Sequence, residues 1–239
     1  DGGFAQYSAA PAAQCFKLAP ELPFEAGAMA EPLACCLHGI DAAGIRPGST
    51  VCVIGGGAIG LLMVQLARLS GAAKVILSEP VELRRSAGLS VGADLAVDPL
   101  REDLSARVRE AAGKSGADVV IECVGNTAAT RSAFEAAGFG ATVLLFSVPA
   151  PTATVPLPLF DVYKKELAIR GSFINPDTHL RAVELLSAGR SSDLKKELAI
   201  RVDEEPLITH TFGIGEMEQA IKMQMGGESI KVMVLPNKR

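Results

Sequence analysis

The ten residues 51–60 constrain the fold more than any other part of this chain. They read Val-Cys-Val-Ile-Gly-Gly-Gly-Ala-Ile-Gly, and an apolar stretch at 61–69 follows at once. Four apolar, mostly β-branched residues predict a buried parallel strand, and the stretch after the glycines predicts a helix. A strand, a tight glycine-rich turn and a helix in this order are typical of sites where a pyrophosphate rests on a helix N-terminus.

Each of three glycines in this turn has a physical reason to lack a side chain. Gly55 allows the sharp reversal after the strand, and Gly57 leaves room for a pyrophosphate. Gly60 allows the helix to pack close to the strand, and the helix N-terminus offers its free N–H groups to the phosphates. The spacing of these glycines therefore predicts a dinucleotide-binding turn.

An acidic residue stands where a dinucleotide's ribose would need it. The apolar stretch 74–78 predicts a second strand, and Glu79 follows it, 24 positions after Gly55. This spacing is close to the ~20 positions typical of the acid that accepts hydrogen bonds from the adenosine ribose. A doubly wound domain that holds another ligand, such as S-adenosylmethionine, stays open as the alternative.

Predicted strands and helices alternate regularly after residue 50. The strands are expected at 51–54, 74–78, 94–97, 118–123 and 142–147, with helices between them at 58–70, 81–91, 102–112 and 127–137. Such repetition predicts an α/β fold, with a doubly wound parallel sheet covered by helices on both faces. A further strand at 167–173, after a proline-rich connection, completes a six-stranded sheet at one edge.

The segments on either side of this alternation follow a different pattern. Residues 1–7 look like a strand entered from a turn, and a helix is expected to begin near Pro32 and end near Gly44. The tail after Asn175 is not predicted to form another strand–helix–strand unit. Its expected elements are a helix near 178–188, an extended stretch at 206–210, a helix at 216–225 and a strand at 230–235. We expect this tail to pack with the N-terminal segment in a second domain.

Charge and cysteine content narrow the class of protein. The net charge is −4, without a basic stripe, which argues against a nucleic-acid partner. No apolar run approaches the ~18 residues of a membrane span, and no secretory signal is expected. The five cysteines form no Cys-x-x-Cys pair, and Cys52 and Cys123 lie in predicted strands. An odd number with buried members indicates a reducing, cytoplasmic setting.

One heptapeptide, Lys-Lys-Glu-Leu-Ala-Ile-Arg, occurs twice, at 164–170 and 195–201. No larger unit repeats around it, so it is not the period of a repeat protein. We interpret it as a small local duplication without a function of its own.

Several motifs together resemble one known family. They are Asp-Gly-Gly-Phe-Ala at 1–5, Glu-Pro-Leu at 31–33, the glycine-rich turn, Val-Ile-Glu-Cys-Val-Gly at 120–125, Gly-Ser-Phe at 171–173 and Gly-Glu-Ser-Ile-Lys at 227–231. Nearly end to end, the chain resembles the medium-chain zinc-dependent dehydrogenases, nearest the sorbitol and threonine dehydrogenase branch. In that family a Rossmann domain interrupts a mainly β catalytic domain. The resemblance implies partial catalytic segments at 1–33 and 174–239 around a dinucleotide-binding domain at 34–173.

The resemblance also implies which residues contact the cofactor. They are Gly55, Gly57, Ala58, Ile59 and Gly60 towards the pyrophosphate and nicotinamide, Glu79 and Arg84 at the adenosine ribose, Cys123 and Val124 beside the adenosine, Ser147, Val148, Ser172 and Phe173 around the nicotinamide, and Lys231 at the pyrophosphate. Plain structural roles stay open for several of them. Arg84 and Arg85 either form a solvated helix face or accommodate a 2′-phosphate, which only NADP carries. NAD is expected, and NADP is the alternative. Lys231 is otherwise a surface lysine, and Cys123, Ser147 and Val148 are otherwise core residues.

Glu31 has two interpretations. In the polyol branch an acid at this place lies beside the catalytic zinc, and the resemblance implies that environment here. Within the chain itself, Glu31 complements the dipole at the start of a helix. The family's Cys and Gly-His-Glu zinc motif has no counterpart in this sequence, and one carboxylate is not a site. We therefore expect a truncated member that is inactive and binds no zinc alone.

The resemblance implies an oxidoreductase that passes hydride from an alcohol or polyol to NAD(P), with zinc polarising the hydroxyl in an intact member. Two alternatives stay open: a dinucleotide-binding module without chemistry, and an S-adenosylmethionine-dependent methyltransferase. The edge strand at 167–173 would leave backbone groups unpaired, which favours a homodimer or homotetramer that pairs there.

Overall fold

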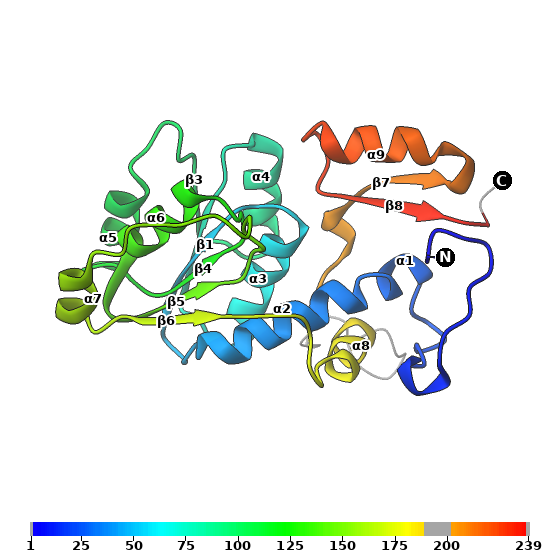
Figure 1. Cartoon of the computed structure of the whole chain (residues 1–239), viewed down its shortest axis with the longest axis horizontal. Coiled ribbons are helices and arrows are strands. Elements are labelled where there is room, and N and C mark those ends of the chain that lie inside the picture. Colours follow the sequence, from blue (N-terminus) through cyan, green and yellow to red (C-terminus); the bar gives the residue numbers. More distant parts are fainter. Residues whose placement is uncertain (1, 189–201, 238–239) are drawn as a thin grey trace.

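The computed structural model describes residues 2–188 and 202–237, and a parallel β-sheet forms its largest part, on the left in Figure 1. Within these residues, six strands follow the order β3-β2-β1-β4-β5-β6, and every neighbouring pair is parallel. They are β1 (Thr50–Ile54), β2 (Lys74–Ser78), β3 (Leu95–Val97), β4 (Ala117–Glu122), β5 (Ala137–Leu145) and β6 (Ala168–Gly171). The order reverses between β1 and β4, as in doubly wound folds. The predicted α/β class is confirmed.

Helices cover both faces of this sheet. The described helices are α1 (Phe24–Gly27), α2 (Ala30–Ala43), α3 (Ala58–Leu69), α4 (Glu82–Ser90), α5 (Leu104–Ala112), α6 (Thr127–Ala136), α7 (Leu159–Lys165), α8 (His179–Ser187) and α9 (Met217–Met225). Val51 and Val53 pack in a core shared with α2 and α3, whereas Cys52 and Ile54 pack in a second core shared with α5 and α6. Because β1 is buried on both sides, its residues from Val51 to Ile54 are all apolar and do not alternate with polar ones.

The predicted N-terminal strand is wrong. Residues 3–6 form bends, and the side chains around them are exposed, with Phe4 69% and Tyr7 92% accessible. A strand needs a partner for its backbone N–H and C=O groups. No strand pairs with this segment among the residues that the structure describes, so its backbone groups lack the partners that a strand needs.

The prediction that the tail lacks a further strand–helix–strand unit is also wrong. β7 (Ile208–Gly213) and β8 (Lys231–Leu235) are parallel neighbours, and α9 connects them. The unit has its own two-stranded sheet to one side of the main sheet (Figure 1, orange to red). The sequence predicted an extended stretch at 206–210, a helix at 216–225 and a strand at 230–235 separately, and only the parallel pairing of the two strands into one unit was missed.

β6 lies at the edge of the main sheet, as predicted, although it is shorter than expected. Helix α7 was not predicted; it follows Pro158, within the connection that the sequence analysis described only as proline-rich. The first copy of the repeated heptapeptide ends α7 and begins β6, and the copy at 195–201 lies outside the described residues.

The division of the chain into three segments, at residues 33 and 173, stays a prediction. Helix α2 spans the first boundary and packs on both α3 and α8.

Candidate functional site

The glycine-rich turn connects β1 to α3 with the geometry that its sequence predicts. Gly55 has a φ of +101°, a left-handed conformation that side chains rarely adopt. A Cβ at Gly60 would lie 1.7 Å from the carbonyl oxygen of Gly55, so only glycine lets the helix approach the turn this closely. A Cβ at Gly57, by contrast, would meet no protein atom within 4 Å. Packing therefore explains Gly55 and Gly60, whereas the space at Gly57 is open to a ligand.

The first turn of α3 offers backbone N–H groups at this open space. The first intrahelical bond runs from Leu61 N to the Gly57 carbonyl, at 3.0 Å. The N–H groups of Ala58, Ile59 and Gly60 precede that bond and lie at the positive end of the helix dipole. No side chain caps this end of the helix among the described residues. An anion is the natural partner for such a turn.

Glu79 stands beside the turn at the end of β2 and is 4% exposed. Its Oε2 accepts a hydrogen bond from Gly56 N at 2.6 Å, and its Oε1 accepts one from Val81 N at 2.9 Å. A Cβ at Gly56 would come within 2.8 Å of the Glu79 Cγ atom. The middle glycine, to which the sequence analysis gave no role, therefore makes room for the acidic side chain.

Two cavities lie on either side of Gly57. One, of about 570 Å³, lies at the carboxyl ends of the central strands, with Glu79, Val81, Leu100 and Val124 in its wall. The other, of about 930 Å³, lies between the start of α3 and the β7–α9–β8 unit. Gly57, Arg84 and Cys123 line both cavities, and Lys231 lines the larger one together with Ala58, Ile59 and Gly60. An elongated ligand across the turn would occupy both.

The two arginines of α4 have different roles, and neither is a simple solvated surface residue. Arg84 faces the cavities and donates from Nη2 to the carbonyl oxygen of Ser229 at 3.0 Å, which ties α4 to the segment just before Lys231. Its Nε is buried and finds no hydrogen-bond partner in the described structure. Arg85 is 14% exposed in its side chain and pairs with Glu82 and Asp98.

Glu122, which the sequence analysis did not assign, organises the loops after β4 and β5. It is 2% exposed, and its Oε1 accepts hydrogen bonds from Val124 N at 2.7 Å and Gly125 N at 2.9 Å. The Ser147 hydroxyl donates to its other carboxylate oxygen. An acid that ends an otherwise apolar strand was the available signal. Glu122 thus connects two predicted cofactor residues, Val124 and Ser147.

The predicted nicotinamide-side residues do not line either cavity. Val148 and Phe173 are 92% and 79% exposed. Ser172 continues β6 through a bond from its N–H to the Leu145 carbonyl at 3.2 Å, and its hydroxyl is buried without a described partner. These residues lie after β5 and β6, at the same edge of the sheet as the glycine-rich turn.

Glu31 lies in the first turn of α2 and is exposed. Its Oε1 accepts from the Cys35 thiol at 3.2 Å and from Asn175 Nδ2 at 3.1 Å. Burial, followed by this hydrogen bond, raises the pKa of Cys35 to about 11, so the thiol stays protonated at neutral pH. Residues 2–188 and 202–237 contain no group of three or more His, Cys, Asp or Glu that could hold a metal. The described residues therefore do not form a zinc site.

The chain belongs to the zinc-binding dehydrogenase family, whose model matches residues 58–188, more than half of the sequence. It is 30% identical over 237 residues to a sorbitol dehydrogenase from Gallus gallus, covering 98% of this chain and 63% of that protein. It is also 30% identical over 239 residues to an L-threonine 3-dehydrogenase from Caldanaerobacter subterraneus, covering 99% of this chain and 65% of that protein.

Comparison with a solved structure supports the same family assignment. A protein from Sinorhizobium meliloti 1021, described as a zinc-binding dehydrogenase and bound to NADP, superposes with a TM-score of 0.90 at 38% identity. The match covers 99% of this chain and 66% of that one. The chain thus spans somewhat less than two thirds of the relatives that it matches. None of the described helices is both long and apolar enough to cross a lipid bilayer.

Proposed function

We propose that this chain binds a nicotinamide dinucleotide across the glycine-rich turn and forms the cofactor-binding part of an NAD(P)-dependent alcohol or polyol dehydrogenase. The observation that carries the proposal is the open, amide-lined turn at Gly57, which lies between two cavities and beside the fixed carboxylate of Glu79. The family match favours this function over the methyltransferase alternative.

Each part of the chain has a definite task in this proposal. The N–H groups at the start of α3 bind the diphosphate, and Arg84 and Lys231 add positive charge from the cavity walls. Glu79 accepts hydrogen bonds from the adenosine ribose, which favours NAD over NADP because its charge repels a 2′-phosphate. Cys123 and Val124 border the adenosine, and Ser147, Val148, Ser172 and Phe173 belong to the nicotinamide side.

A nicotinamide dinucleotide bound at this turn would supply the hydride acceptor for the oxidation of an alcohol. The chain's own share is to bind and orient the ring. The polyol and amino-alcohol substrates named for the relatives support an alcohol or polyol substrate for the whole protein. Zinc needs ligands that the described residues do not bring together, and Glu31 is the only residue that we propose for the surroundings of the zinc ion.

Five free cysteines support a cytoplasmic location.

Calorimetric titration with NADH tests the proposal directly. We expect one site per chain and an affinity that falls when Lys231 is replaced by alanine, because a positive charge near the diphosphate is lost. The chain contains no tryptophan, so the fluorescence of the bound nicotinamide can be followed without interference from the protein. A titration that shows a heat of binding for S-adenosylmethionine but none for NADH or NADPH would refute the proposal.

We also propose that two copies pair through β6. Ser172 N bonds to the Leu145 carbonyl, so strand alternation directs the N–H of Ile169 away from β5. Proline at position 169 therefore removes a donor only from the open edge, where proline is tolerated. Analytical ultracentrifugation is expected to find a dimer for the wild type and a monomer for Ile169→Pro, with Ile169→Val still dimeric. A monomeric wild type would refute the pairing.

A further inference from the structure

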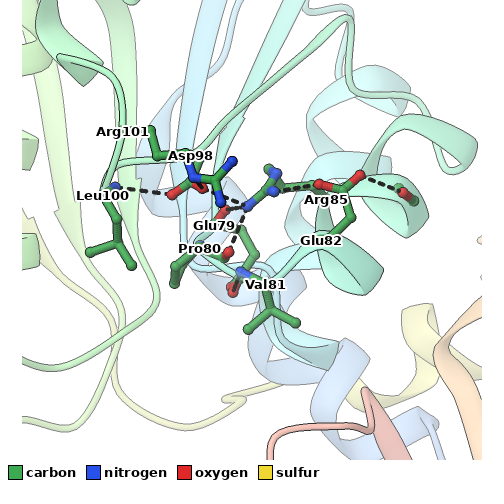
Figure 2. A network of polar contacts seen from close by, with 9 residues as sticks. Glu79, Pro80, Val81, Glu82, Arg85, Asp98, Leu100 and Arg101 are labelled. Atoms are coloured by element: carbon green, nitrogen blue, oxygen red, sulfur yellow. Dashed lines mark hydrogen bonds and ion pairs between the residues drawn. The ribbon is translucent and has the colours of Figure 1, made fainter.

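Arg85 is held at the centre of a polar network beside the β2–α4 turn (Figure 2). Its Nη1 donates to the carbonyl oxygens of Glu79 and Pro80, at 2.8 and 2.6 Å. The same nitrogen lies 3.5 Å from Asp98 Oδ2, and Nη2 pairs with Glu82. With these partners and 14% exposure, the guanidinium is committed to the protein and is not free for a ligand.

The network joins two loops that form one wall of the 570 Å³ cavity. The first is the turn 79–81, whose carbonyl groups Arg85 binds. The second is the connection after β3, where Asp98 Oδ1 accepts a hydrogen bond from Leu100 N at 3.0 Å. Glu79, Val81 and Leu100 all line the cavity. Arg85 thus fixes the two loops relative to each other without itself entering the cavity.

Arg85 also fixes the main chain on which the Glu79 carboxylate stands. The carboxylate accepts hydrogen bonds from Gly56 N and Val81 N, and the carbonyl oxygen of the same residue accepts one from Arg85. A guanidinium suits this task because its planar fork serves several acceptors at once. Two of its acceptors are carbonyl oxygens of the turn, which is otherwise held on this side by the bond from the Glu79 N–H to the Val97 carbonyl at 3.0 Å, so loss of the fork loosens the turn.

We propose that Arg85 is a positioning residue that sets the selectivity between NADH and NADPH, an inference that rests on the proposed dinucleotide function. A fixed carboxylate attracts the ribose hydroxyls and repels a 2′-phosphate. Both effects weaken with distance. When the turn is freed, NADH loses an acceptor and NADPH loses a repulsion, so the two affinities converge.

The test compares Arg85→Met with Arg101→Met in the full chain, by calorimetry with NADH and with NADPH. Arg101 is a matched control because it pairs with the same Asp98, at 3.5 Å, yet is 84% exposed and does not touch the turn. Both variants remove one positive charge. We expect the NADPH-to-NADH ratio of dissociation constants to fall about tenfold in Arg85→Met and to change less than about twofold in Arg101→Met. Arg85→Lys, which keeps the charge but not the fork, falls between them.

The outcomes separate this inference from the function on which it rests. If the wild type binds neither nucleotide, the proposed function fails. If the wild type binds NADH and Arg85→Met lowers only the melting temperature while the ratio stays unchanged, Arg85 is merely structural and the inference is overturned. Should Arg85→Met fail to fold, Arg85→Lys decides: a fall of about threefold in the ratio supports the inference, and an unchanged ratio overturns it.

Discussion

Replacing Gly60 with alanine is expected to destabilise the fold by about 3 kcal/mol or more, the upper range for overpacked sites. The new methyl group would lie 1.7 Å from the Gly55 carbonyl oxygen, and it cannot rotate away because the main chain fixes the positions of both atoms. Either α3 moves off the sheet or the turn opens, and each loses buried contacts of Leu61 and Val64 with the core. Urea unfolding followed by circular dichroism measures the loss.

Gly57→Ala is the matched control, because it adds the same methyl group three residues earlier. Gly57 has a φ of −70°, which alanine adopts freely, and its Cβ would meet no protein atom within 4 Å. The stability of the Gly57→Ala variant is expected to stay within about 1 kcal/mol of wild type. Its NADH affinity is expected to fall roughly 100-fold, because the methyl group displaces the diphosphate from its N–H donors. Equal stability losses in both variants would contradict this division between packing and binding.

Glu122→Leu is expected to cost about 3–5 kcal/mol of stability, because it leaves the N–H groups of Val124 and Gly125 and the Ser147 hydroxyl without their acceptor in a buried place. Glu122→Gln keeps an oxygen for the two N–H groups, and its amide can donate to the Ser147 oxygen. We expect this second variant to lose only about 1 kcal/mol.

The same pair of variants gives a second measurement. The loops that Glu122 holds carry Val124, which lines the smaller cavity, so Glu122→Leu is expected to weaken NADH binding even at temperatures where it is fully folded. Glu122→Gln binds nearly as well as wild type. A Leu variant as stable as the Gln variant would show that the loops hold themselves without the carboxylate.

Local patterns explain why the main sheet and the turn were predictable from the sequence. A strand buried on both faces must be apolar throughout, and a turn that reverses sharply and then starts a closely packed helix must have glycine at set positions. The assignment of Gly55, Gly60 and Glu79 needed only these rules and a count of residues. Both glycines have the geometry that was expected of them.

Contacts between distant parts of the chain explain what was missed. Nothing local marks Ser229 as the partner of Arg84, or Ser147 as the partner of Glu122, because these pairs meet only after the sheet has formed. Arg84 and Arg85 are neighbours of one residue type, yet one faces the cavities and the other the network around Asp98. The β7–α9–β8 unit was missed for the same reason: its two strands were predicted separately, but their parallel pairing joins residues that are distant in the sequence.

The larger cavity has walls from two remote stretches of chain, the start of α3 and the last strand, β8. In the proposed function a nucleotide there acts as a removable cross-link between the middle of the polypeptide and its tail. Occupancy stabilises the folded state by mass action, in proportion to the logarithm of nucleotide concentration once the site is saturated. The resistance of the tail to proteolysis thereby becomes tied to the supply of nucleotide.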